Sequence, residues 1–479
     1  MHSSVIVGLC GNVDTFKIIR SIPDVLRILA MAWRAMLYDK HLIASTGPVI
    51  LTIRIDLDAN FEEIVDALGG TVQHLAAAVH QHFLLVRSNP IISATEIFNL
   101  VSCFGFLTCS KGQMALRLNE ALVSIGFIPK LISTMSIMHD AGANKAVQFS
   151  IYYLLCSFML ASGYPTIALA LRSGLLPTII KVAASMKMKD ERPRDLIRTS
   201  TMLKTLLTEL LPRAPVHCAV VSELKNILPE AAKLAAQSRL SKSVFSRDWK
   251  GFSDWKGFSA LAVERIKLFD SWERLSRISF KACDNMNCDK IARKDKFKSY
   301  WRAGHRDECQ ELRTIRLQHP DTLGLSTRGK SFLSALLRDD YLLYMPGITI
   351  HQVKFMHTHP YKCDLLTAFF YIGGRGVQIG VKPVSDLKAT PWAAQLPRQI
   401  SRMAQSGGRM EVHLVVYYEG EKIRRVLLPM RTPTAKFHGG LLRALEIVPP
   451  GKTVEGVSWD MGRRVAGGDG GDTDLNNRH

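Results

Sequence analysis

The sequence predicts an all-helical domain followed by a small α+β domain, with a short cysteine-containing segment between them. Three observations lead to this fold class. A helical hydrophobic period runs from about residue 14 to residue 275, a glycine-proline motif recurs within this region, and strand-like runs appear only after residue 341. The expected organisation is a helical repeat domain over 1–275, a cysteine segment over 281–312, an α+β domain over 331–462 and a disordered tail over 463–479.

The helical period is clearest near the start of the chain. Pro23 is suited to the first turn of a helix, where its missing N–H costs nothing. Seven apolar residues then fall on one helical face: Ile22, Val25, Leu26, Leu29, Trp33, Met36 and Leu37.

A repeated motif indicates an armadillo-like or HEAT-like domain. Residues 126–132 read GFIPKLI and residues 174–180 read GLLPTII, an offset of 174 − 126 = 48 residues. A weaker echo is Asn226-Ile-Leu-Pro229. Glycine can end one helix in a left-handed conformation, and proline three residues later fits the first turn of the next helix.

Two other segments of the helical region invite alternatives. Residues 146–171 carry no charge, but Gly163, Tyr164 and Pro165 divide them, which favours two core helices over a membrane span. The hexapeptide DWKGFS occurs at 248–253 and again at 254–259. We expect a duplication tolerated in a loop, the alternative being an aromatic docking motif.

The strand-like part of the chain begins after a short expected helix over 331–341. Residues 419–421 are expected to form a hairpin turn, and the glycine-rich segment 374–380 a second one. The expected strands cover residues 349–355, 365–372, 377–381, 411–418 and 423–428.

Composition limits the classes of function. The chain is 47% hydrophobic and 22% charged, as a globular protein is, and its net charge of +20 favours acidic partners. No long basic run occurs, so specific nucleic-acid binding is not expected. The start of the chain lacks the features of a secretory signal, so we expect an intracellular protein, cytoplasmic or nuclear, and thiols at Cys10, Cys103, Cys109, Cys156 and Cys218.

The remaining chemistry gathers in the segment 281–312. Cys283, Cys288, His305 and Cys309 form a Cys-x4-Cys pair and a His-x3-Cys pair among charged residues. Zinc takes four such donors at tetrahedral corners, and two short pairs separated by a loop supply them. The spacing therefore predicts a metal site, with Zn²⁺ as the cofactor.

These residues resemble the two ends of a MYND-type zinc finger, in the variety common in fungal proteins. Residues 283–288 read CDNMNC and residues 301–309 read WRAGHRDEC. The family has two further ligand pairs between these ends, which residues 289–299 do not contain. Three hypotheses follow: a new single-zinc site, a decayed finger without metal, or the product of a transcript that lacks the middle of the finger.

The resemblance implies a zinc-binding protein-interaction or scaffold protein with a protein as its partner, and a regulatory role is the expectation that goes with it. A scaffold without metal is the first alternative. The second is an enzyme with a site in the C-terminal domain around His357, His359 and Cys363. No methyltransferase, P-loop, dinucleotide-binding or hydrolase motif is found, so the sequence favours a protein that is not an enzyme.

Overall fold

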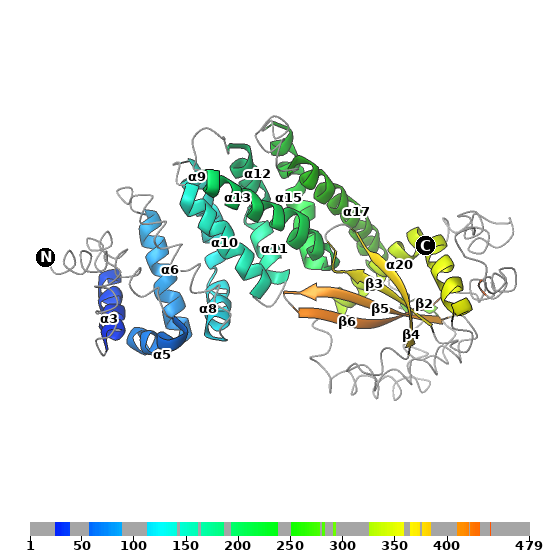
Figure 1. Ribbon diagram of the computed structural model, residues 1–479, viewed down its shortest axis with the longest axis horizontal. Helices are drawn as coiled ribbons and strands as arrows, with labels where there is room; N and C mark the ends of the chain where they lie inside the picture. The colour runs from blue at the N-terminus through cyan, green and yellow to red at the C-terminus, as the bar shows by residue number, and fades with distance from the viewer. Residues whose placement is uncertain are drawn as a thin grey trace. The chain divides into compact units, whose positions relative to one another are not determined.

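The structure, a computed structural model, describes the chain as a mostly helical protein with a small sheet near its C-terminus (Figure 1). The described residues are 24–38, 57–88, 113–140, 144–160, 164–185, 193–237, 251–277, 280–282, 291–293, 325–358, 365–373, 376–384, 410–420, 422–431 and 441. The expected tail over 463–479 lies outside them.

The chain divides into two compact units. The helical unit comprises Met1–Ala214, Ser222–Ala260 and Glu419–Glu421, and the mixed unit comprises Pro215–Val221, Leu261–Tyr418 and Lys422–His479. The predicted fold class is confirmed at a coarse level, because the described residues are mostly helical and carry a small mixed sheet near the C-terminus.

The helical unit begins with α3 (Val25–Tyr38), α5 (Leu57–Leu68) and α6 (Val72–Ser88), which pack on one another. The predicted apolar face of α3 is confirmed, because Leu26, Leu29 and Leu37 are buried. Trp33 on the same face donates a hydrogen bond from Nε1 to Nδ1 of His82 at 3.2 Å. Burial lowers the pKa of His82 to about 3, so this imidazole is a neutral acceptor.

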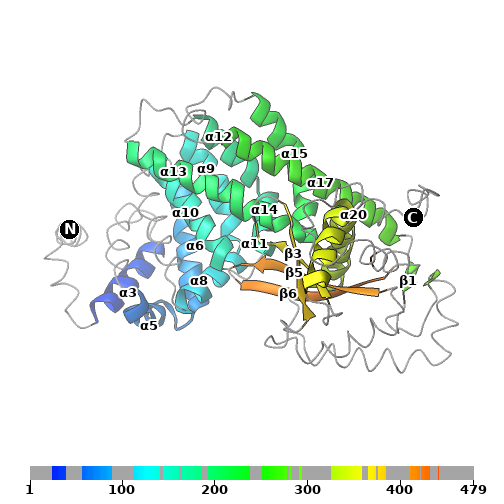
Figure 2. The ribbon, with the colours of Figure 1, turned by 45° about the vertical axis from the view of Figure 1, so that its right-hand side comes forward.

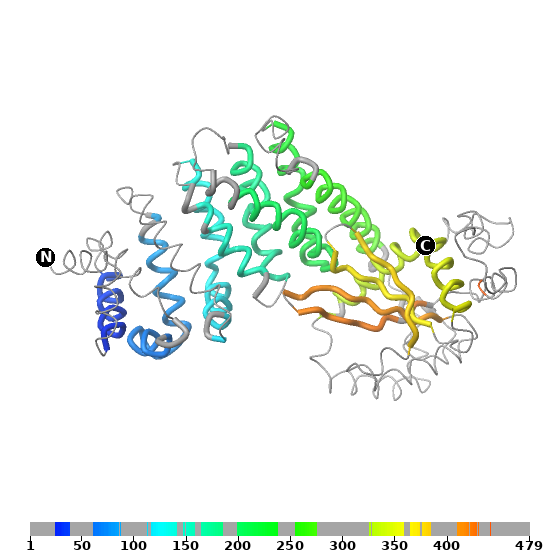
Figure 3. The backbone as a smooth tube through the Cα atoms, in the orientation of Figure 1, coloured from blue at the N-terminus to red at the C-terminus, as the bar shows by residue number. Residues whose placement is uncertain are grey.

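Six further helices form two sets of three. They follow one another along the cyan to green part of the tube in Figure 3. The first set is α8 (Gln113–Ser124), α9 (Phe127–Asp140) and α10 (Asn144–Leu160), and the second is α11 (Tyr164–Arg172), α12 (Leu175–Ser185) and α13 (Pro193–Thr205). A glycine with positive φ separates the first two helices of each set: Gly126 at +79° and Gly174 at +87°. The predicted glycine-proline punctuation is confirmed at both places.

Corresponding helices of the two sets pack together, α9 against α12 and α10 against α13 (Figure 1). In α9 and α12, four pairs of residues 48 positions apart are buried in both helices. The equivalent pairs are Phe127 and Leu175, Ile128 and Leu176, Leu131 and Ile179, and Ile132 and Ile180, all buried. The recurrence in the sequence is therefore a recurrence of core positions.

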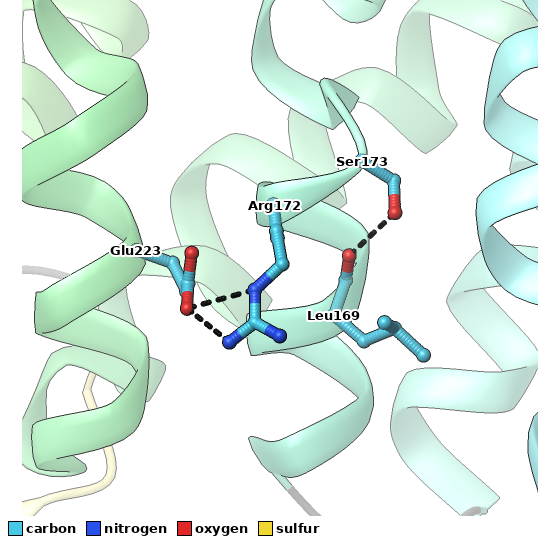
Figure 4. Close-up of polar contacts among 4 residues, drawn as sticks. All are labelled: Leu169, Arg172, Ser173 and Glu223. Carbon is cyan, nitrogen blue, oxygen red and sulfur yellow. Dashed lines mark hydrogen bonds and ion pairs between the residues drawn. The ribbon is translucent and has the colours of Figure 1, made fainter.

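The end of α11 is fixed by polar contacts (Figure 4). Ser173 donates its hydroxyl to the carbonyl oxygen of Leu169 at 2.7 Å, within the last turn. Arg172 donates its Nε–H to Oε1 of Glu223 at 3.0 Å, which ties α11 to α15 (Cys218–Gln237). The Glu223 side chain is 11% exposed and that of Arg172 68%, so the carboxylate is the buried partner.

The chain passes from α13 to α15 through a π-helical turn, Leu206–Leu210, the short α14 (Leu211–Arg213) and a 3-10 turn, Ala214–Val216. The weak third echo of the motif then lies inside α15, where Pro229 is an internal residue of a continuous helix. Asn226 therefore ends no helix, and the interpretation of these residues as a third helix break is wrong.

The second copy of the duplicated hexapeptide is also not a loop. It lies within α17 (Gly251–Arg277), with Trp255 and Phe258 buried and their ring centroids 6.1 Å apart. These two residues and the buried Ala262 are spaced i, i+3 and i+7, which puts them on one face. Burial of this face explains why these residues form a helix and not the expected loop.

The uncharged stretch 146–171 divides as predicted. α10 ends at Leu160 and α11 begins at Tyr164, and both carry buried residues. Among the residues that the structure describes, no single helix has both the length and the apolar character of a membrane span. Two consecutive pairs satisfy that test only when joined across their bends, α8 with α9 at 81° and α11 with α12 at 69°.

The mixed unit contains a long helix, α20 (Thr327–Thr358), and the strands β3 (Leu365–Tyr371), β4 (Gln378–Pro383), β5 (Met410–Glu419) and β6 (Lys422–Arg431). The expected helix over 331–341 is thus the middle of a longer one. The strand expected over 349–355 is wrong, because the helix continues to residue 358. Ile348, Gln352 and Val353 are buried on one helical face, so packing overrides the β-propensity of this segment.

The four strands form one sheet in the order β4-β3-β5-β6. The two predicted hairpins are present, β3 with β4 antiparallel, and β5 joined to β6 through Gly420. β3 and β5 are parallel, with Thr367 opposite His413. One face packs against α20, as Figure 2 shows.

The left-handed glycines allow a first test. A Cβ at residue 126 or 174 would meet no atom within 4 Å, so Gly126→Ala and Gly174→Ala should cost only backbone strain. We expect each to lower the free energy of unfolding by about 1–2 kcal/mol, measured by thermal unfolding followed by circular dichroism. Gly257→Ala is the control, because residue 257 lies in α17 without a positive φ and alanine should stabilise it slightly. Equal responses at all three sites would contradict the conformational explanation.

Candidate functional site

The predicted metal ligands Cys283, Cys288, His305 and Cys309 lie outside the described residues. Their nearest described neighbours are two short antiparallel strands, β1 (Phe280–Ala282) and β2 (Ile291–Arg293). Ala282 pairs with Ile291, so the pair brings together the two ends of the segment that contains the first cysteine pair. In the part of the chain that the structure describes, no group of three His, Cys, Asp or Glu side chains could hold a metal ion.

Of the second predicted cluster, only His357 is described. It lies in the last turn of α20, and its Nε2 atom is buried without a hydrogen-bond partner in the structure. His359 and Cys363 lie outside the described residues, so the cluster stays a prediction.

The described cysteines differ from each other. Cys218 is a free thiol at the start of α15, and burial raises its pKa while the charge of Arg328 partly opposes this. Cys156 in α10 is disulfide-bonded, so the expectation of a thiol is wrong at that position.

A cluster of ionisable side chains lies between α17, α20 and the sheet, within the mixed unit. Alternation along β5 places Glu411, His413, Val415 and Tyr417 on the same face. The helical period of α20 directs Asp340 and Tyr341 toward that face together with the buried leucines Leu333, Leu336 and Leu337. Polar groups therefore stand inside an otherwise apolar layer.

The first half of the cluster is a buried ion pair. Arg265 on α17 donates to both carboxylate oxygens of Asp340, at 3.1 and 3.2 Å. The side chains are only 9% and 4% exposed. Tyr371, at the end of β3, donates its hydroxyl to Oδ2 of Asp340 at 2.8 Å. Burial, and next the charge of Asp340, raises the pKa of Tyr371 well above 10, so the phenol stays a donor.

The second half joins α20 to β5. Tyr341 donates its hydroxyl to Oε2 of Glu411 at 3.1 Å. Burial raises the pKa of Glu411 to about 7, and the hydrogen bond from Tyr341 opposes this shift in part. The Glu411 side chain is still 27% exposed, so this carboxyl can exchange protons with solvent.

His413 stands beside Glu411, with Nε2 3.5 Å from Oε2. The residue is fully buried, and neither ring nitrogen has a hydrogen-bond partner in the structure. Burial lowers its pKa to about 3, so the ring is neutral at physiological pH. Tyr341 and Phe369 make T-shaped contacts with its ring, with ring centroids 5.2 and 5.6 Å away. An unsatisfied buried polar atom costs about 1–3 kcal/mol.

A carboxyl group that titrates near neutral pH beside a neutral imidazole is chemically suited to moving a proton. The arrangement nevertheless encloses most of its members, since Asp340 and His413 are 3% and 0% exposed. The geometry fits a polar core that fixes α20 on the sheet better than it fits a substrate site. None of these residues is among the site residues predicted from the sequence. The alternation along β5 could have indicated the cluster, because Glu411 and His413 fall on the same face as Val415 and Tyr417 in a strand rich in buried residues.

The comparisons with known proteins gave no relative. No family model matches the chain, and neither the curated proteins nor the solved structures include a match. The resemblance to the MYND finger therefore stays a prediction from the residues that carry it.

The buried ion pair gives a second test. Asp340→Asn leaves Arg265 as a buried charge without its counter-charge, so we expect a loss of about 3–5 kcal/mol in the free energy of unfolding. The double variant Arg265→Met, Asp340→Leu should lose less unfolding free energy than the sum of the losses of Arg265→Met and Asp340→Leu, because it removes both charges. Urea denaturation measures both effects.

The control for this test is Glu273→Gln, which weakens an exposed pair in the same unit. Arg328, the partner of Glu273, is 61% exposed, so the change should stay below about 1 kcal/mol. A comparable loss in the control, or additive losses in the double variant, would contradict a special role of the buried pair.

Proposed function

We propose that the chain is a metal-ion-binding scaffold for protein–protein interaction, with an armadillo-like helical repeat and a reduced MYND-like finger. The observation that supports the scaffold is the 48-residue equivalence of buried positions between α9 and α12, together with the packing of α9 on α12 and of α10 on α13. Stacked helical sets of this kind bury a shared core and leave extended surfaces on which partners bind. The net charge of +20 favours a partner with an acidic surface.

The metal part of the proposal has its support in the ligand types and their spacing. Three cysteines and one histidine within 27 residues supply one tetrahedral zinc site. The pairing of β1 with β2 is compatible with it, because it holds the two ends of the Cys283 and Cys288 segment side by side. Thiolates in a charged segment gain more from a metal than from an apolar core.

Zinc content tests the metal site directly. The full-length chain, purified without a histidine tag, should contain about one equivalent of zinc by elemental analysis. Cys283→Ser combined with Cys309→Ser should remove it and lower the melting temperature, because binding of a structural metal contributes folding free energy. The matched control is Cys218→Ser, which changes a free thiol outside the finger and should leave the zinc content unchanged.

Two outcomes separate the alternatives. Less than about half an equivalent of zinc in carefully purified protein would reject the metal site. If the double serine variant also leaves the melting temperature and partner binding unchanged, the chain is a scaffold with a decayed finger.

A further inference from the structure

β6 is an edge strand of the sheet in the mixed unit. In the order β4-β3-β5-β6 it has β5 on one side, and no described strand lies on its other side (Figure 1). It spans 10 residues, Lys422–Arg431, whereas β4 at the opposite edge spans 6. An edge strand of this length presents a row of backbone N–H and C=O groups to which another strand can add.

The hairpin turn determines which backbone groups of β6 face outward. β5 ends at Glu419 and β6 begins at Lys422, with Gly420 at a φ of +62°, so the loop has two residues. In such a hairpin the two residues that flank the loop exchange hydrogen bonds, and the pattern recurs at every second residue. The even-numbered residues of β6 therefore direct their backbone groups to β5, and the odd-numbered residues direct theirs to the open edge.

The apolar packing and a proline agree with this register. It places Val426 opposite Val415, and both belong to the apolar cluster next to α20. It also places Leu427 opposite Leu414, and these two pack together on the other face of the sheet. Pro429 has no N–H, and it falls on an odd-numbered position where the pairing with β5 loses no hydrogen bond.

The open edge, residues 423–427 of β6, is basic. Its outward N–H and C=O groups belong to Ile423, Arg425 and Leu427, and Ile423 is an exposed large apolar residue. Neither Lys422 nor Arg425, both exposed, forms an ion pair with a residue that the structure describes. The strand contains no acidic residue and has these basic ones: Lys422, Arg424, Arg425 and Arg431.

We propose that the open edge binds an extended acidic segment of a partner protein, which adds to the sheet as a further strand beside β6. Backbone hydrogen bonds with Ile423, Arg425 and Leu427 supply affinity, and acidic side chains opposite the basic ones supply the preference for this partner. The proposal deepens the proposed interaction function by assigning a surface to it. It requires neither the metal nor the helical repeat.

A second copy of the chain is a poorer occupant of this edge. Pairing of two β6 strands would set basic side chains against basic side chains, and like charges on facing strands destabilise the pair. Basic residues and proline are also the means by which edge strands avoid pairing with themselves. The same charges attract an acidic strand, so charge complementarity favours a different protein.

A synthetic peptide can test the proposal on the full chain. The probe is an end-blocked peptide of about eight residues in which glutamate alternates with valine, a sequence suited to an extended strand. Fluorescence anisotropy measures its binding. Two control peptides should bind at least about 10-fold more weakly, one with every backbone amide N-methylated and one with lysine in place of glutamate.

Amide hydrogen exchange shows where the probe binds. The peptide should slow exchange of the Ile423, Arg425 and Leu427 amides at least about 10-fold. The amides of Arg424 and Val426 already pair with β5, so their exchange should not change. This alternation distinguishes strand addition from a general attraction between opposite charges.

Variants of one edge residue separate the backbone from the charge. Arg425→Gln removes the charge alone and should weaken binding about 3-fold, whereas Arg425→Pro also removes an outward N–H and should weaken it at least about 10-fold. Lys382→Gln is the control, because it removes a charge from β4 at the opposite edge, and it should change the affinity less than about 2-fold. If Arg425→Pro unfolds the mixed unit, the N-methylated peptide makes the same comparison.

Several results would overturn the proposal. They are no binding of the glutamate-valine peptide, equal binding of its N-methylated form, and equal protection of odd-numbered and even-numbered amides. Dimerisation that protects the same amides would identify a second copy as the occupant. Cys283→Ser combined with Cys309→Ser should bind the peptide as the wild type does, so loss of the metal site and failure of this proposal are distinguishable.

Discussion

The mixed unit depends on the contact of Asp340 with Arg265 and Tyr371. One carboxylate receives both donors of a guanidinium from α17 and a phenol from β3, so it links two helices and the sheet at a single point. Loss of the α17 contact would leave the buried Asp340 carboxylate without its counter-charge. The cost of that state is several kcal/mol, so the three elements are expected to dock together.

Tyr341, the next residue of α20, extends this polar layer to β5. Its hydroxyl reaches Glu411, whose exposure and near-neutral pKa make it the member of the layer that can change charge. Asp340 and Tyr341 therefore have different consequences. Asp340 forms an ion pair with Arg265. Tyr341 instead contacts Glu411, a carboxyl whose pKa lies near neutral pH.

Local conformation was predictable where a single residue decides it. The sequence located the turns at Gly126 and Gly174, because the left-handed backbone there excludes most other residues. It also located the buried face of α3 and the strands β3, β5 and β6, where the period of apolar residues matches the structure. These are features in which local sequence and tertiary environment agree.

The errors have a common physical cause. Residues 349–355 and the second DWKGFS copy have local patterns that suggest a strand and a loop, yet both are helical because their apolar residues pack on a core at helical spacing. Pro229 suggests a helix break but is carried within α15. Propensities of about 1 kcal/mol or less per residue are outweighed by burial of large side chains.

The sequence by itself determined the division into a helical and a strand-bearing part, the 48-residue recurrence, and the four candidate metal ligands, because composition, period and spacing are local properties. Only the tertiary structure showed that Arg265, Asp340, Tyr371, Tyr341, Glu411 and His413 meet. These residues come from α17, α20, β3 and β5, and their side chains gain or lose charge through burial by distant segments. Desolvation depends on the packed surroundings of an atom, and no pattern within one segment contains that information.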